Sequence, residues 1–331
     1  MAGWSFAFIV VIIGIALLFD FTNGMHDAAN SVATIVSTRV LSPKRAVIWA
    51  AFFNFVAFLL FGTAVANTIG QGLIDINVVD PLVIFGGLVG AIAWNLLTWY
   101  LGLPSSSSHS LMGGYLGAAV AKAGFRVVIV KGWIKVLIFI VLAPMMGMAL
   151  GLVLMILTTW AVRKQPVQAI SIWSKRMQFV SAALYSLGHG GNDAQKTMGI
   201  IAGLMYTSGH MKEFHIPLWI VLSAHTAIAM GTLTGGWRIV KTMGQKIVKL
   251  RPIDGFCAET ASAISIFTAT HLGVPVSTTH VITGAVAGVG TAKNAASVKW
   301  QVTIRIVYAW VLTIPMAAFC AAIVYELCRL F

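Results

Sequence analysis

Two short polar clusters stand inside apolar stretches that are otherwise long enough to cross a membrane. The first contains Asp27 and the second contains Asp193, and both follow a Gly-x-x-Asp-Ala pattern. An ionisable group inside an apolar span is costly, so it indicates a functional site. The two aspartates are 166 residues apart, half of the 331-residue chain. This spacing predicts a membrane transporter built from two related halves.

The composition agrees with a polytopic helical membrane protein. Hydrophobic residues make up 59% of the chain and charged residues 9%, whereas roughly a quarter of a globular domain is charged. The apolar runs are broken by glycines and short polar sites, and the alternating segments of a membrane β-barrel are missing from the sequence. We therefore expect an all-α polytopic membrane protein.

The net charge of +13 does not indicate nucleic-acid binding, because Lys and Arg gather in short loops between apolar runs. Such loops orient a membrane protein and contact anionic lipids. The loops at 39–45, 163–176 and 238–251 are basic. In the loop at 67–81 the only charged residues are Asp75 and Asp80. The positive-inside rule places the basic loops in the cytoplasm and the N-terminus outside.

Each half also contains a Gly-x-Pro-hydroxyl-His segment between two apolar runs. The first runs from Gly102 to His109 and the second from Gly273 to His280, 171 residues later. Non-helical backbone at membrane depth is tolerated where it lines a cavity or is covered by protein. The pattern predicts a re-entrant-like hairpin in each half, with its tip inside the membrane.

The two halves are expected to have opposite orientations, because the first Asp-bearing run leads inward and the second leads outward. We predict an inverted-topology repeat, with residues 1–162 as the first transport repeat, residues 163–176 as a short cytoplasmic connecting loop and residues 177–331 as the second repeat. The basic stretch 122–135 falls outside in this scheme, against the positive-inside rule, and its threading stays open. Gly24, Gly190 and Gly191 predict an unwound segment in each Asp-bearing helix.

The residue types in these segments suit ions and anions. Asp27 and Asp193 are either structural acids or coupling-ion ligands and proton carriers, because hard cations prefer carboxylate, amide and carbonyl oxygens. The hairpin hydroxyls precede helical runs, and a helix N-terminus binds anions. Two facing tips would surround a tetrahedral oxyanion with donors. The tip residues are Ser106, Ser107, Ser108, Ser277, Thr278 and Thr279.

The repeat is asymmetric at one position, where Asn30 in the first half corresponds to Lys196 in the second. An amide oxygen can ligate Na⁺, whereas an ammonium replaces a cation. Lys196 is therefore expected to contact the anion or to substitute for a coupling cation. Glu259 is either a proton site or the partner of Lys196. His109 and His280 are either hydrogen bonders near the hairpin tips or substrate ligands and proton-relay groups.

Together these motifs resemble the inorganic phosphate transporters of the PiT type, in the family's order over nearly the whole chain. The resemblance implies cation-coupled symport of phosphate, alone or as a metal-phosphate complex, by alternating access across the plasma (inner) membrane. It also implies a homodimer in the lipid bilayer and no cofactor beyond the coupling ion. The carrying motifs are 23–34, Trp94-Asn95, 102–109, 190–196 and 273–280.

The resemblance also implies the residues of the site. Substrate and ion binding fall to the two Asp motifs and the two hairpin tips, and no resident metal is expected. H⁺ is favoured over Na⁺, because the Lys196 variant is similar to the bacterial branch described as proton-coupled. The binding residues would be Asp27, Asn30, Asp193, Gln195, Lys196, Ser106, Ser107, Ser108, Ser277, Thr278 and Thr279, with Asn23, His26, His109, Asn192, Glu259 and His280 in support.

Three other functions compete with phosphate symport. Sulfate has a similar size and shape, although a nearby acceptor such as Asp27 would favour protonated phosphate. An intramembrane enzyme would use Ser and His as a catalytic pair, but the Ser-His neighbours occur twice and catalysis needs only one. A channel is less suited to two non-identical halves with paired buried acids. We therefore expect a transporter and not an enzyme.

Overall fold

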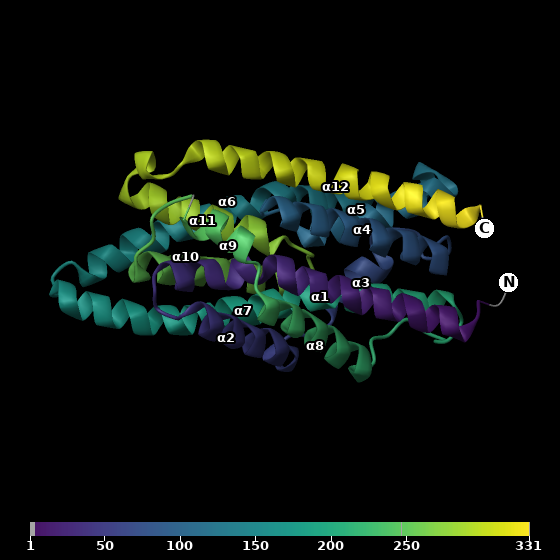
Figure 1. Cartoon of the computed structure of the whole chain (residues 1–331), viewed down its shortest axis with the longest axis horizontal. Helices are drawn as coiled ribbons and strands as arrows, with labels where there is room; N and C mark the ends of the chain where they lie inside the picture. Colours follow the sequence, from purple (N-terminus) through teal and green to yellow (C-terminus); the bar gives the residue numbers. More distant parts are fainter. Residues whose placement is uncertain (1–3, 246, 331) are drawn as a thin grey trace.

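Helices form nearly all of this chain, whose computed structural model describes residues 4–245 and 247–330 (Figure 1). Within these ranges no β-strand forms, and Ile74 and Val128 make one isolated antiparallel bridge. The all-α prediction is confirmed. The first half holds α1 (Phe6–Ser37), α2 (Pro43–Val56), α3 (Ala64–Gln71), α4 (Pro81–Leu101), α5 (Ser107–Ala123) and α6 (Val130–Val162). The second holds α7 (Val167–Thr207), α8 (Leu218–Thr234), α9 (Trp237–Gln245), α10 (Pro252–His271), α11 (Thr278–Lys293) and α12 (Trp300–Arg329).

Several of these helices can cross a membrane by their length and composition. In the described ranges four helices meet that test, namely α1, α4, α6 and α12. The number rises to six if two bent pairs each count as one span, with α2 bent by 84° against α3 and α8 bent by 74° against α9. The two bent pairs occupy the same place in the two halves, as a repeat requires.

The halves are interleaved, because glycines let each hairpin pack against a long helix of the other half. The second helix of the first hairpin, α5, packs on α12, and α11 packs on α6. A Cβ atom added at any of four glycines would lie 2.0–2.5 Å from a facing carbonyl oxygen, so only glycine fits. The four contacts are Gly113–Ile314, Gly117–Ala318, Gly284–Pro144 and Gly288–Met148.

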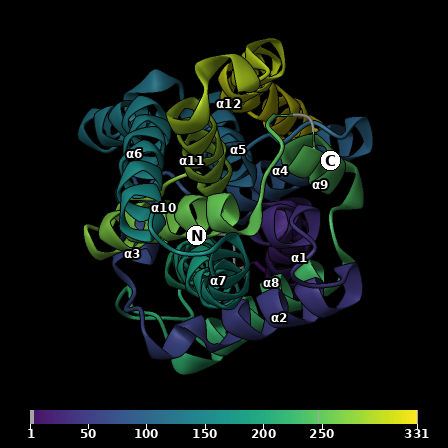
Figure 2. The ribbon, with the colours of Figure 1, turned by 90° about the vertical axis from the view of Figure 1, so that its left-hand side faces the viewer.

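The two Asp-bearing helices lie together in the middle of the bundle. Figure 1 shows that α1 and α7 run in opposite directions along the long axis, as an inverted repeat predicts. Figure 2 shows them between α2 and α8 on one side and α10 and α11 on the other. Each packs against the bent pair of the opposite half, α1 against α8 and α9, and α7 against α2 and α3.

The prediction that the Asp-bearing helices unwind is wrong. Both α1 and α7 are continuous through their Asp motifs. Their glycines instead admit neighbouring backbone: a Cβ at Gly24 would lie 2.2 Å from the Ile228 carbonyl oxygen, and one at Gly190 would lie 2.4 Å from that of Asn54. Close helix packing, which a single sequence does not reveal, is therefore the reason for these glycines.

Each hairpin returns to the side from which it starts. Lys122 at the end of α5 binds Asp80 at the start of α4, with Nζ 2.7 Å from Oδ2. Lys293 binds Asp254 at the same distance at the base of the α10–α11 hairpin. Residues 122–135 therefore lie at the same end as the loop before α4, as the inverted scheme requires. The connecting segment is shorter than the expected 163–176, because α7 already begins at Val167.

Candidate functional site

The first Asp motif contacts both hairpin tips. Asp27 Oδ2 lies 3.0 Å from Ser107 Oγ of α5 and 3.5 Å from Thr279 Oγ1 of α11. The Asn30 amide donates to Thr279 Oγ1 over 2.8 Å. All four side chains are buried. Residues far apart in the sequence thus meet in one polar cluster between the two halves.

Lys196 joins the second Asp motif to the same tips. Its ammonium pairs with Asp193 Oδ1 on its own helix. It also donates to Ser108 Oγ over 2.5 Å and to the Val276 carbonyl oxygen over 2.8 Å. The partner of Lys196 is therefore Asp193, and the alternative pairing with Glu259 is not formed. One fixed positive charge lies against a carboxylate and against both hairpins.

The N-termini of α5 and α11 meet beside this cluster. Ser106 and Ser277 are their caps, and their hydroxyls accept the backbone N–H groups of His109 and His280 over 3.2 and 3.3 Å. The two imidazole rings contact each other edge to face, with centroids 4.7 Å apart. Thr278 Oγ1 has no hydrogen-bond partner among the described residues. Two positive helix ends thus converge where an anion would be stabilised.

Residues preceding the two aspartates connect the motifs to the hairpins in parallel ways. His26 Nδ1 lies 2.7 Å from Asp27 Oδ1, and its Nε2 lies 3.2 Å from Thr98 Oγ1 at the end of α4. Asn192, which precedes Asp193, donates to Thr270 Oγ1 at the end of α10 over 2.8 Å. Each half therefore fixes its Asp motif to the first helix of its own hairpin.

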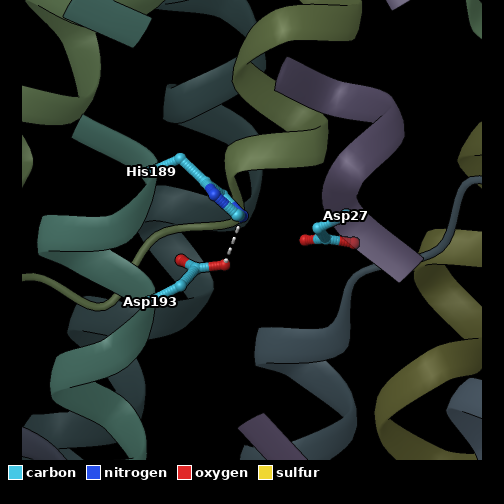
Figure 3. A group of neighbouring side chains, drawn as sticks. All are labelled: Asp27, His189 and Asp193. Atoms are coloured by element: carbon cyan, nitrogen blue, oxygen red, sulfur yellow. Dashed lines mark ion pairs between the residues drawn. The ribbon is translucent and has the colours of Figure 1, made fainter. Parts of the chain in front are cut away.

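A third ionisable group lies between the two aspartates. One ligand atom each of Asp27, His189 and Asp193 falls within 4.8 Å of the others (Figure 3). His189 Nε2 lies 3.5 Å from Asp193 Oδ2, and its Nδ1 lies 3.1 Å from Asn54 Oδ1. The Asn54 amide donates to Thr232, so its oxygen faces the ring and Nδ1 carries the proton. The Nε2 lone pair then faces the carboxylates, an arrangement that favours a cation or a proton between them.

Glu259 lies apart from the central cluster, toward the C-terminal end of α1. It accepts hydrogen bonds from Thr34 Oγ1 over 2.5 Å, Ser181 Oγ over 2.5 Å and Gln178 Nε2 over 3.1 Å. Thr34 is seven residues, two helical turns, beyond Asp27 on α1. Three neutral donors therefore hold this buried carboxyl in place.

Gln195 is the one predicted binding residue whose side chain is fully engaged elsewhere. Its amide oxygen accepts the backbone N–H groups of Val65 and Ala66 over 2.9 and 3.4 Å, and its nitrogen donates to the Gly191 carbonyl over 2.5 Å. These contacts cap the first turn of α3. Gln195 thus stabilises the packing of α3 on α7.

Several buried polar residues around the central cluster were not predicted from the sequence. They continue the Asp motifs along one face of each helix. Polar residues spaced three or four positions apart in the sequence could therefore have indicated them. Asp20 accepts from Asn23 Nδ2 over 3.4 Å, and Asn23 Oδ1 accepts from Ser107 over 2.5 Å. The overlooked residues are Asp20, Thr34, Gln178, Ser181 and His189.

An inverted helical repeat with a buried polar site between its halves defines a multi-pass membrane transporter. The chain belongs to the phosphate transporter family, whose profile matches residues 23–176 and 167–321. The two matches correspond to the two halves of the structure. A family of transporters, with relatives named as transporters, excludes the enzyme alternative.

The relatives span almost the entire chain. A probable low-affinity inorganic phosphate transporter from Rhizobium meliloti (strain 1021) is 56% identical over 97% of this chain and 96% of its own length. One from Bacillus subtilis (strain 168) is 43% identical over 96% of both. A solved structure described as the sodium-dependent phosphate transporter has a TM-score of 0.90 and 26% identity, covering 98% of this chain and all of its own.

Proposed function

We propose that this protein imports inorganic phosphate across the plasma membrane by cation-coupled symport with alternating access. The observation that carries the proposal is the meeting of both hairpin tips at the two Asp motifs, with Lys196 bound to Asp193, Ser108 and the Val276 carbonyl. Converging helix N-termini and an ammonium suit an oxyanion. Residues 1–162 and 177–331 are proposed as the two repeats whose relative movement exposes the site to either side.

The hydrogen-bond acceptors beside the two hairpin tips favour phosphate over sulfate as the substrate. Asp27 faces Ser107 and Thr279 with a carboxylate oxygen. A carboxylate accepts a hydrogen bond from a protonated anion and repels one without a proton. Hydrogen phosphate carries such a proton near neutral pH and sulfate does not. The names of the relatives, which specify phosphate, support the same choice.

The coupling ion is proposed to be H⁺. Lys196 stands where the first half has Asn30, so a fixed ammonium fills the place of one cation ligand. Other buried titratable groups, such as His26 beside Asp27 and Glu259, supply proton sites. Sodium is the alternative, because the similar solved structure is described as sodium-dependent.

A metal-phosphate complex is a second candidate substrate. The convergence of Asp27, His189 and Asp193 favours it, since carboxylate and imidazole ligands suit a divalent cation arriving with the anion. Such an ion would be cargo. Stimulation of phosphate uptake by equimolar divalent metal, together with co-transport of the labelled metal, would support this substrate.

The bilayer is proposed to cover the apolar outer faces of α6 and α12. These helices expose large hydrophobic side chains along their length, such as Leu137, Val141, Phe319 and Ile323. Side chains of this type are stable in hydrocarbon. A homodimer in this bilayer stays a proposal that rests on the family resemblance, and cross-linking in native membranes would test it.

The test is uptake of ³²P-labelled phosphate by proteoliposomes. We expect accumulation when an inward pH gradient is imposed, competition by arsenate and weak competition by sulfate. Accumulation driven only by a sodium gradient would reject the proton assignment. Failure to accumulate phosphate under any gradient, with sulfate accumulating instead, would reject phosphate as the substrate.

A further inference from the structure

One buried carboxyl has no part in the central cluster. Asp20 of α1 is 0% exposed and accepts one long hydrogen bond, 3.4 Å from Asn23 Nδ2. Its second oxygen, Oδ2, accepts no hydrogen bond of normal distance and angle from the described residues. The Thr197 hydroxyl on α7 is nevertheless close enough to stabilise the charged carboxylate. No Lys, Arg or His in that part of the chain forms an ion pair with it.

In the expected topology, with the N-terminus outside, Asp20 lies on the outer side of Asp27. Asp20 precedes Asp27 by seven residues on α1, about 10 Å along a helix that enters from the outer side. A buried carboxylate without a counter-charge is unstable in such surroundings, so the group takes up a proton unless a partner compensates it. Its place and its missing partner suit a group that meets protons arriving from outside.

The charged groups of α4, α5, α7 and α8, four of the helices packed against α1, leave this carboxyl without a dedicated partner. On α7, the charges of Asp193 and Lys196 both interact electrostatically with the Asp20 carboxyl, but these two residues are paired with each other. On α8, His225 bonds to the Val221 carbonyl and packs against Phe58. On α5, His109 lies against His280. Helix α4 contains no Asp, Glu, Lys, Arg or His.

A hydrogen-bonded chain links Asp20 to the central site. Asn23 donates to Asp20 with its nitrogen, and its oxygen lies 2.5 Å from Ser107 Oγ at the hairpin tip. Ser107 Oγ also lies 3.0 Å from Asp27 Oδ2. A serine hydroxyl has one proton, so it donates to Asn23 or to Asp27 but not to both. The hydroxyl therefore has two alternative partners.

We propose that Asp20 is an outer proton-binding site whose protonation decides which partner Ser107 binds. The inference rests on the proposed proton-coupled symport. A proton from the outer side adds to an oxygen of Asp20, and the new O–H donates to Asn23 Oδ1 once the amide has turned over. Asn23 Nδ2 then donates to Ser107 Oγ, and Ser107 donates to Asp27. One O–H bond forms at Asp20, and release of that proton reverses every step.

The equivalent positions of the second half do not form such a carboxyl-amide-hydroxyl chain. Ser186 occupies the position of Asp20 in the repeat and donates to the Ala182 carbonyl of its own helix over 2.8 Å. His189 occupies the position of Asn23 and bonds to Asn54. The outer proton site is thus specific to the first half, and Ser186→Ala is a matched control on the equivalent turn of α7.

The experiment separates phosphate exchange from proton-driven accumulation in proteoliposomes. Asp20→Asn keeps the shape of the side chain but cannot titrate. We expect it to retain exchange of internal for external phosphate at equal pH, to lose accumulation driven by a pH gradient and to show a flattened pH profile. Asp20→Glu should restore accumulation, and Ser186→Ala should behave as the wild type.

Three outcomes would overturn the inference. The first is accumulation by Asp20→Asn with the wild-type pH profile. The second is an equal loss of exchange and accumulation in both Asp20→Asn and Asp20→Glu, which would show a structural role. The third is loss of a sodium-driven component alone, which would make sodium the ligand. Absence of phosphate exchange in the wild type would instead reject the proposed function.

Discussion

At the scale of single residues, the protein differs most from perfect repeat symmetry where Lys196 replaces the counterpart of Asn30. Asn30 donates to the tip of the opposite hairpin, whereas Lys196 pairs with Asp193 and contacts both hairpins. A lysine ammonium supplies permanently the charge that a bound cation would supply transiently. Under the proposed symport, the exchangeable coupling ion would therefore bind in the first half.

Replacing this ammonium tests the assignment. Lys196→Met should cost about 3–5 kcal/mol of stability, because it leaves the buried Asp193 carboxylate without its partner. Lys196→Asn, which restores the residue of the first half, should make phosphate uptake respond to sodium. Uptake under separate sodium and pH gradients measures the change. Unaltered ion dependence of Lys196→Asn would show that Lys196 does not replace a cation.

At the scale of elements, glycine stripes rather than apolar side chains determine how the hairpins pack. A Cβ on Gly288 of α11 would lie 2.0 Å from the Met148 carbonyl oxygen of α6, and the corresponding contact of Gly117 with Ala318 is 2.1 Å. Close backbone approach of this kind is typical of helix pairs in membranes. The hairpin tips therefore keep their place beside the Asp motifs because their second helices lie tightly on α6 and α12.

A methyl group is enough to test this packing. Gly288→Ala should lower the free energy of unfolding by about 1–3 kcal/mol, since the facing atom is backbone and cannot move alone. Gly14→Ala on α1 is the control, because nothing lies within 4 Å of the added Cβ there. Thermal unfolding in detergent compares the two. Equal melting temperatures for Gly288→Ala and the wild type would refute the close contact.

At the scale of the whole molecule, the inverted repeat accounts for the end of the bundle at which a basic stretch lies. Residues 122–135 carry Lys122, Arg126, Lys131 and Lys135. The ion pair of Lys122 with Asp80 and the bridge between Ile74 and Val128 hold this stretch beside the loop before α4. In the expected topology this end faces outward, and the local pairing with Asp80 would offset the usual preference of basic residues for the cytoplasm.

Accessibility to a membrane-impermeant thiol reagent checks this topology. In a variant lacking Cys257, Cys320 and Cys328, Lys131→Cys should react from the outer side and Lys164→Cys only after the membrane is opened. The expectation follows from their positions, because Lys131 lies at the start of α6 and Lys164 lies just after its end. Labelling of both from the same side would show that α6 does not cross the membrane, and labelling of Lys164→Cys alone from outside would reverse the expected topology.

The sequence by itself determined the class of protein, the two halves and most of the cluster. Apolar runs can cross a bilayer only as helices in a chain of this pattern, and the repeated Asp and hairpin motifs mark where polarity is buried. The repeat also indicated opposite orientations. These features follow from local composition and spacing, which a linear chain displays directly.

Only the tertiary structure decided which groups meet. The pairing of Lys196 with Asp193, the capping role of Gln195 and the separate place of Glu259 depend on how helices from the two halves cross. The continuity of α1 and α7 through their glycines also depends on a neighbouring backbone, namely Ile228 and Asn54. Contacts between residues far apart in the chain arise from packing, and spacing along one sequence does not encode them.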